Sequence, residues 1–188
     1  MSKKRGHTVL KLIIFFVLIY FMIINIPVLL KVIYPLHYRE TIMKYSREYR
    51  LDPYTVAAVI RTESSFNPFA ESGKGARGLM QITPTTGKWI AGKLQIKNYT
   101  DDSLFDPAVN IRLGCWYINH LYDYYGGSSE LVFAAYNGGQ GNVDKWLKDK
   151  SFSQNGRTLD VIPFPETKKF VERINRNRSI YMKLYNLE

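Results

Sequence analysis

The hydrophobic and polar positions of the chain follow two different patterns. Residues 9–33 are almost wholly apolar, whereas the rest of the chain mixes short apolar runs with polar segments. A helix needs roughly 20 apolar residues to cross the hydrocarbon core of a membrane. The pattern therefore predicts a transmembrane anchor at residues 9–33, a short cytoplasmic tail at residues 1–8 and a globular domain at residues 34–188.

A cleaved signal peptide is the alternative reading of the apolar segment. The apolar region of a signal peptide spans about 7–15 residues and ends in small residues, whereas this run is longer and ends in bulky residues at 28–32. The basic residues at 3–5 favour a cytoplasmic N-terminus, although the basic residues at 31, 39 and 44 weaken that argument. We expect a single-pass protein of the cell membrane whose globular domain lies on the extracytoplasmic side.

The globular part carries helix signals, while strand-like alternation is weak and confined to residues 95–99. An N-cap residue followed by proline at the first helical position predicts a helix start. Two further helices are predicted from Ser129 to the Asn137-Gly138-Gly139 stop and over residues 166–187, the latter amphipathic with a basic outer face. The proline signal occurs three times, at Asp52-Pro53, Thr83-Pro84 and Asp106-Pro107. We therefore predict an all-α domain.

The charge balance adds a preference for an anionic partner. The formal net charge is +10, which suits nucleic acid, anionic lipid or a polyanionic wall polymer without choosing among them. No nucleic-acid module is present, and an extracytoplasmic position removes that partner. Anionic wall polymers stay as candidate partners of the basic last helix, beside the simpler explanation of a solvated face.

Cysteine and histidine usage argues against a thiol enzyme and a metal site. The single cysteine, Cys115, lies in an apolar context and is expected to be a buried structural thiol. A nucleophilic cysteine needs a nearby base, and His120, five residues further on, does not share its helical face. Three scattered histidines and one cysteine give no ligand spacing. We expect no metal, no other cofactor and a monomeric protein.

The first candidate for chemistry is Glu63, near the end of the apolar helix that begins at Pro53. The negative end of the helix dipole and desolvation by apolar neighbours such as Phe66 would both raise the pKa of this carboxyl. A raised pKa suits a general acid that must stay protonated near neutral pH. On this pattern alone, a solvated glutamate at a helix end is the commoner explanation.

Two glycine-containing segments strengthen the case for a binding cleft. Residues 70–81 form a short loop with three glycines and a serine, which allows positive φ angles and close approach to another surface. Residues 135–141 place the Tyr136 ring and the Asn137 amide beside further glycines. Aromatic faces and planar amides are suited to sugar recognition, through stacking and hydrogen bonds.

Three motifs follow one another along the chain at fitting distances. They are Glu63-Ser64-x-Phe66-x-Pro68-x-Ala70-x-Ser72-x-x-Gly75-Ala76-x-Gly78-Leu79-Met80-Gln81-Ile82-x-Pro84, then Ala135-Tyr136-Asn137-Gly138-Gly139-x-Gly141, then Ile162-Pro163-Phe164-Pro165-Glu166-Thr167-x-x-Phe170-Val171. Together they resemble the soluble-type lytic transglycosylases, which share the goose-type lysozyme fold. The resemblance covers residues 40–180 and implies a lysozyme-like catalytic domain that acts on the glycan strands of peptidoglycan.

The resemblance also implies roles for single residues. Glu63 stands at the position of the catalytic acid/base, and Ser72 and Gln81 stand at positions that contact the muramoyl residue and the acid. Tyr136 stands at the position of the tyrosine beside the catalytic carboxylate, and Asn137 follows it as in the family. Glu166 stands at the position of a glutamate that lies in the cleft and is used for binding. Two positions depart from the family pattern. Thr83 replaces a methionine that packs on the sugar, and Gly139 replaces an alanine, which we expect to be silent.

The chemistry implied by the resemblance uses Glu63 twice. The protonated carboxyl first protonates the oxygen that links N-acetylmuramic acid to N-acetylglucosamine. The resulting carboxylate then removes the proton of the muramic 6-hydroxyl, which attacks the anomeric carbon with help from the substrate's N-acetyl group and gives a 1,6-anhydro end. A second catalytic carboxylate is usual in glycosidases, but none of the candidates by composition stands at a position that the motifs specify. They are Glu71, Asp101, Asp102 and Asp106.

Two alternatives stay open at the level of sequence. A muramidase of the same fold would use water in place of the 6-hydroxyl, and residue patterns barely separate the two reactions. A non-catalytic peptidoglycan-binding protein would keep the cleft without the reaction.

Overall fold

The computed structural model describes residues 2–187, and it describes no side chains at positions 2–6, 8 and 9. The basic side chains at residues 3–5, which belong to the expected cytoplasmic tail, therefore lie outside the described part of the structure. The chain divides into two compact units, one ending at Pro35 and the other beginning at Leu36. Each unit is described by itself.

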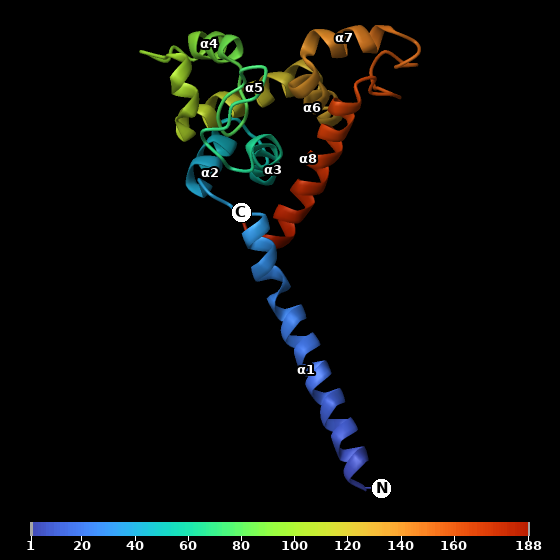
Figure 1. The fold of residues 1–188 in the computed structure, drawn as a ribbon. Coiled ribbons are helices and arrows are strands. Elements are labelled where there is room, and N and C mark those ends of the chain that lie inside the picture. Colours follow the sequence, from blue (N-terminus) through green and yellow to red (C-terminus); the bar gives the residue numbers. More distant parts are fainter. Residues whose placement is uncertain (1, 188) are drawn as a thin grey trace. The chain divides into compact units, whose positions relative to one another are not determined.

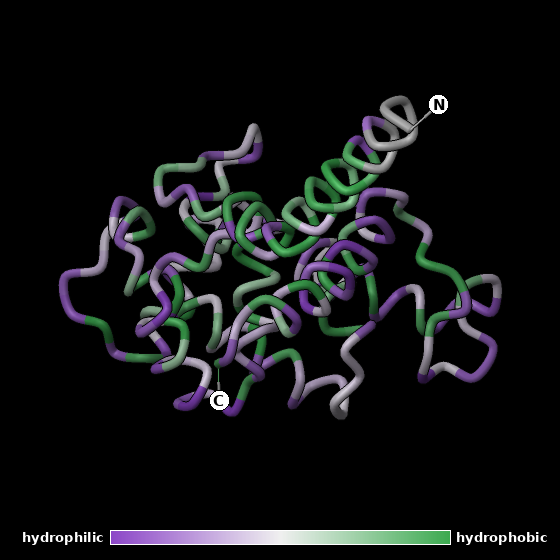
Figure 2. Tube along the Cα trace, turned by 90° about the horizontal axis from the view of Figure 1, so that it is seen from below, coloured by the Kyte–Doolittle hydropathy of each residue, from purple (hydrophilic) through white to green (hydrophobic). Residues whose placement is uncertain are grey.

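The first unit is a single long helix, α1 (Ser2–Ile33) (Figure 1). Its stretch Leu10–Ile33 has a mean hydropathy of 2.8, and none of it is buried within the protein. Figure 2 shows this stretch as an almost continuous hydrophobic segment. By length and composition the helix can cross a membrane, although an N-terminal signal sequence would meet the same criterion.

The second unit is helical, which confirms the predicted fold class. Among the described residues there is no β-strand, only two isolated bridges that join Arg77 to Glu71 and to Ile82. The elements are α2 (Arg39–Glu48), α3 (Pro53–Ser64), α4 (Pro84–Lys93), the 3-10 helix η1 (Asp101–Phe105), α5 (Pro107–Tyr124), α6 (Ser129–Gly138), α7 (Gln140–Lys148) and α8 (Pro165–Leu184).

The three predicted helix starts are confirmed. Asp52, Thr83 and Asp106 each accept a hydrogen bond from a backbone N–H in the first turn, and proline follows each of them. The weak strand-like alternation at residues 95–99 forms no strand, because Gln95 and Asn98 adopt positive φ angles that turn the chain.

The core is organised around α3, in which six consecutive residues, 55–60, are buried. A helix buried on all sides needs small residues where its neighbours approach closely, and Ala57 and Ala58 meet this need. Helix α8 packs along α3 and contributes the buried side chains of Phe170 and Tyr181. This enclosed segment leads directly into the last turn of α3, which carries Glu63.

The expectation for Cys115 is confirmed. Its thiol is completely buried in α5, and burial raises its pKa far above the ordinary value. The thiolate, which is the nucleophilic form, is therefore disfavoured, and Cys115 is a structural residue.

Candidate active site

The last turn of α3 is tied to its surroundings on both sides of Glu63. Before it, Thr62 Oγ1 accepts a hydrogen bond of 2.9 Å from Asn177 Nδ2 of α8. After it, Ser64 Oγ donates to the Leu79 carbonyl at 2.8 Å. Ser65 and Phe66 then take positive φ angles and turn the chain away. The backbone of Glu63 is thus fixed between α8 and the glycine-containing loop.

Burial raises the pKa of the Glu63 carboxyl to about 8, and two nearby charges modify it. The Arg173 guanidinium lowers the pKa and the Glu166 carboxylate raises it, but desolvation is the largest cause. The expected rise in pKa is confirmed, with burial as its main physical origin. At neutral pH the carboxyl carries its proton and can donate it.

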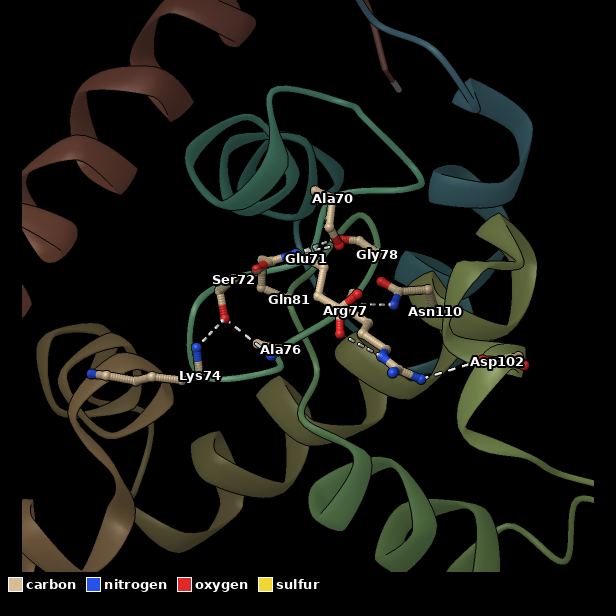
Figure 3. A network of polar contacts seen from close by, with 10 residues as sticks. All are labelled: Ala70, Glu71, Ser72, Lys74, Ala76, Arg77, Gly78, Gln81, Asp102 and Asn110. Atoms are coloured by element: carbon tan, nitrogen blue, oxygen red, sulfur yellow. Dashed lines mark hydrogen bonds and ion pairs between the residues drawn. The ribbon is translucent and has the colours of Figure 1, made fainter.

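The loop at residues 70–82 is closed by its own polar groups (Figure 3). Ser72 Oγ accepts hydrogen bonds from the N–H groups of Lys74 and Ala76, at 3.3 and 3.0 Å. Gln81 Nε2 donates to the carbonyls of Ala70 and Gly78, both at 3.0 Å. Ser72 and Gln81 therefore shape the backbone of the loop, and both side chains are half-buried.

A buried amide fixes the loop to α5. Asn110 is fully buried, and its Oδ1 accepts from the Met80 N–H at 2.7 Å while its Nδ2 donates to the carbonyls of Arg77 and Leu104. Gly78, with φ of 75°, lies against it, and a Cβ atom there would stand 2.1 Å from the Leu104 carbonyl oxygen. Only glycine fits this position.

Tyr136 of α6 reaches the same loop from the other side. Its hydroxyl donates to the Met80 carbonyl at 2.7 Å, and its ring stacks on Phe170 with the planes 3° apart. Burial, together with the charge of Glu63, raises the pKa of the Tyr136 hydroxyl well above its ordinary value. The hydroxyl therefore stays protonated as a donor, close enough to Glu63 to sense its charge.

A pocket of about 270 Å³ opens beside this tyrosine. Three of the predicted site residues line it: Gln81, Tyr136 and Asn137. Ile82, Thr83, Thr86, Tyr117, Gly138 and Gly139 complete the lining. Aromatic rings and amides thus surround a cleft with the mixed polarity that suits a sugar.

Helix α8 contributes the remaining predicted residue. Glu166 lies exposed in its first turn, and its charge acts on Glu63. The next residue, Thr167, donates from Oγ1 to Asn137 Oδ1 at 2.8 Å. The Asn137 amide is therefore held by α8 at the rim of the pocket.

The four carboxylates considered earlier have other positions. Glu71 and Asp102 both pair with Arg77, at 3.2 and 3.3 Å (Figure 3), and Asp106 caps α5. Asp101 is exposed in η1. The carboxylate whose charge raises the pKa of Glu63 is Glu166. Within the described residues, no three His, Cys, Asp or Glu side chains are arranged to hold a metal ion.

Three residues of this region were not identified from the sequence. Asn110 interrupts the apolar face of α5, and a polar residue in such a position is a usable sign of a buried hydrogen-bonding role. Tyr117 lines the pocket but sits in an aromatic-rich helix with no distinguishing pattern. Arg173 is one of several basic residues of α8, and only its position relative to Glu63 sets it apart.

Comparison with known proteins identifies relatives of the second unit. A family model described as "Transglycosylase SLT domain" matches residues 40–157. A putative soluble lytic murein transglycosylase of Haemophilus influenzae is 38% identical over 135 residues, which cover 70% of this chain and 22% of that protein.

Solved structures agree with this relationship. The lytic transglycosylase Slt of Pseudomonas aeruginosa, an inactive mutant, has a TM-score of 0.73 and 34% identity, covering 82% of this chain and 25% of that one. A 70-kDa soluble lytic transglycosylase in complex with bulgecin A has a TM-score of 0.71 and is 30% identical in sequence. The match covers 80% of this chain and 25% of that one. The chain thus spans about a quarter of the length of these relatives.

Proposed function

Because this chain belongs to the transglycosylase SLT domain family, we propose that it is a lytic transglycosylase that cuts the glycan strands of peptidoglycan. The bond cleaved joins N-acetylmuramic acid to N-acetylglucosamine. One observation carries the proposal: the Glu63 carboxyl is kept protonated by burial and lies within electrostatic reach of Tyr136, which lines a pocket rich in aromatic rings and amides.

In the first step Glu63 acts as a general acid. Its proton passes to the bridging glycosidic oxygen as the bond from that oxygen to the anomeric carbon breaks, and positive charge develops on the muramoyl ring. A pKa of about 8 keeps the acid form dominant at neutral pH. The exposed Glu166 carboxylate, whose charge acts on Glu63, supplies a negative charge that favours the developing cation.

In the second step the same residue acts as a general base. The Glu63 carboxylate accepts the proton of the muramic 6-hydroxyl while that oxygen forms its bond to the anomeric carbon, which gives the 1,6-anhydro end and restores the acid. The engagement of Glu71, Asp102 and Asp106 in ion pairs and caps supports a mechanism with one catalytic carboxyl.

The other site residues position these groups. Gln81 and Ser72 hold the loop beneath the pocket, and Tyr136 joins that loop to α6 through the Met80 carbonyl. Asn137 offers its amide at the rim. Thr83 uses its hydroxyl to cap α4, so it presents a small polar surface to the pocket instead of a thioether.

We also propose that α1 anchors the protein in the cell membrane with the second unit on the extracytoplasmic side, where its substrate lies. The uninterrupted apolar length of Leu10–Ile33 supports this assignment. Membrane fractionation, followed by protease treatment of intact cells stripped of their wall, tests it, because only an outward-facing domain would be digested.

The reaction is tested by the mass of the products. Purified full-length protein in detergent is incubated with peptidoglycan, and the released fragments are analysed by mass spectrometry. We expect 1,6-anhydro ends from the wild type and a loss of roughly 10²- to 10⁴-fold in rate for Glu63→Gln. Glu172 is an exposed glutamate elsewhere on α8. The variant Glu172→Gln is therefore the matched control and should keep full activity.

The alternatives predict different products. Fragments that carry only water-added ends would identify a muramidase and contradict the lytic step. An unchanged rate in Glu63→Gln would contradict the role of this residue altogether.

A further inference from the structure

A group of four aromatic side chains lies where α4 meets α5. Trp89 comes from α4, and Trp116, Tyr117 and His120 come from α5; we call them the Trp89 cluster. The Trp89 ring centroid is 5.2 Å from Trp116, 5.3 Å from His120 and 6.3 Å from Tyr117. Trp116 and His120 stack in parallel beneath it, 5.2 Å apart.

The outermost member of the cluster is unusually accessible. Trp89 is 41% exposed, whereas the three rings of α5 are half-buried. All three contacts of Trp89 are edge-to-face, with planes at 72° to 90°. Among the described residues, no aromatic ring stacks in parallel on the Trp89 ring. Parallel stacking is the arrangement that a flat sugar face uses.

The cluster is continuous with the candidate active site. Tyr117 lines the 270 Å³ pocket and contacts the Tyr136 ring at 5.5 Å. Trp89, which contacts Tyr117, lines a second surface pocket of about 450 Å³ with Pro84, Thr85, Lys88 and Asp101. Aromatic contacts therefore lead from the site of Tyr136 to a second pocket outside it.

We propose that the pocket at Trp89 binds a further sugar ring of the glycan strand, beyond the rings held at the Tyr136 pocket. The inference rests on the proposed function, since the two pockets would hold one strand. Trp89 supplies the stacking face, and the Thr85 hydroxyl, the Lys88 ammonium and the Asp101 carboxylate supply partners for hydroxyl and N-acetyl groups. Such a site favours long strands over short ones.

Binding to strands of two lengths tests the proposal. The full-length Glu63→Gln protein in detergent is titrated calorimetrically with a tetrasaccharide and an octasaccharide of alternating N-acetylglucosamine and N-acetylmuramic acid. When Trp89→Ala is combined with Glu63→Gln, the affinity for the octasaccharide should fall by roughly tenfold. The affinity for the tetrasaccharide should stay within about twofold of that of Glu63→Gln alone. Trp89→Tyr, which keeps an aromatic face, should recover most of the loss.

Two further variants separate recognition from folding. Trp89→Leu keeps apolar volume against Tyr117 and should behave like Trp89→Ala, even if the alanine variant is unstable. Tyr124→Ala removes another exposed aromatic ring, 54% accessible at the far end of α5, and should leave both affinities unchanged.

The outcomes are distinct from those of the proposed function. If Trp89→Ala and Trp89→Leu weaken the binding of the tetrasaccharide and the octasaccharide equally, or weaken the binding of neither, no sugar is bound at this pocket. Because Glu63→Gln is used throughout, that result is independent of whether the wild type cleaves peptidoglycan, which the mass analysis of products decides separately.

Discussion

Glu63 is flanked by two residues that take no direct part in the proposed chemistry. Thr62 is bonded to Asn177 and Ser64 to the Leu79 carbonyl, so the backbone that carries the carboxyl is held on both sides. Its desolvation is therefore built into the fold. Keeping a carboxylate in such a place costs free energy whenever the proton is absent.

This leads to a pH dependence of stability. In the folded protein the Glu63 carboxyl keeps its proton up to a pKa of about 8, whereas the ordinary value is 4.5. Between these pH values the folded state binds more protons than the unfolded state, so this residue makes stability fall as pH rises. We expect Glu63→Gln to melt at a higher temperature than the wild type, by a margin that widens from about pH 4.5 to about pH 8 and then stays constant.

Thermal unfolding followed by circular dichroism across this range gives the measurement. Glu172→Gln serves again as the exposed control and should show no such widening. A constant margin for Glu63→Gln between pH 5 and pH 8 would mean that the carboxyl titrates normally and is not desolvated.

The sequence identified some residues of the site and not others, for a physical reason. The position of Glu63 near a helix end and the unusual glycine content of residues 70–81 are local features, visible in one segment. Asn110 and Arg173 act on groups far away in the chain, at Met80 and Glu63. Such pairings are set by packing, which no local pattern records.

At the scale of elements, an N-cap followed by proline or a run of apolar residues at helical spacing predicts most of the helices, whereas α2 and α7 have no such signal. Helix α2 begins after Tyr38, and α7 begins after Gly139, and neither has a side-chain hydrogen bond at its cap. Each is short and turns only a few side chains inward, such as Ile42 of α2 and Trp146 of α7. Tertiary contacts, not local signals, stabilise helices of this length.

The loop at residues 70–82 allows a matched test with two glycines. Gly78→Ala would force a side chain into a positive φ and against the Leu104 carbonyl oxygen, which we expect to destabilise the protein by on the order of 3 kcal/mol and to abolish cleavage. Gly73→Ala, where a Cβ meets nothing within 4 Å, should leave both stability and activity unchanged. Urea unfolding curves and the product assay compare them. Equal stability of the two variants would show that the loop is not fixed against η1.

At the scale of the whole molecule, exposed basic side chains on α8 contribute to the net charge of +10. Five basic side chains of α8 are exposed: Lys168, Lys169, Arg173, Arg176 and Lys183. If this face binds anionic wall polymers, retention of the protein on isolated cell walls should fall severalfold between about 0.1 and 1 M salt, as the Debye length drops from about 10 to about 3 Å. Retention is measured by sedimentation with Glu63→Gln, and a level that does not change with salt would rule out an electrostatic role.

The amide of Asn110 has a consequence for motion. It bonds to the backbone of residues 77 and 80 in the loop, and to that of Leu104 at η1, from a helix in the middle of the domain. Residues 77–80 cannot move away without breaking these bonds to α5, which ties this part of the loop to a buried side chain. Residues 77–80 therefore form a fixed surface next to Gln81 and Ile82 of the pocket, and not a moving lid.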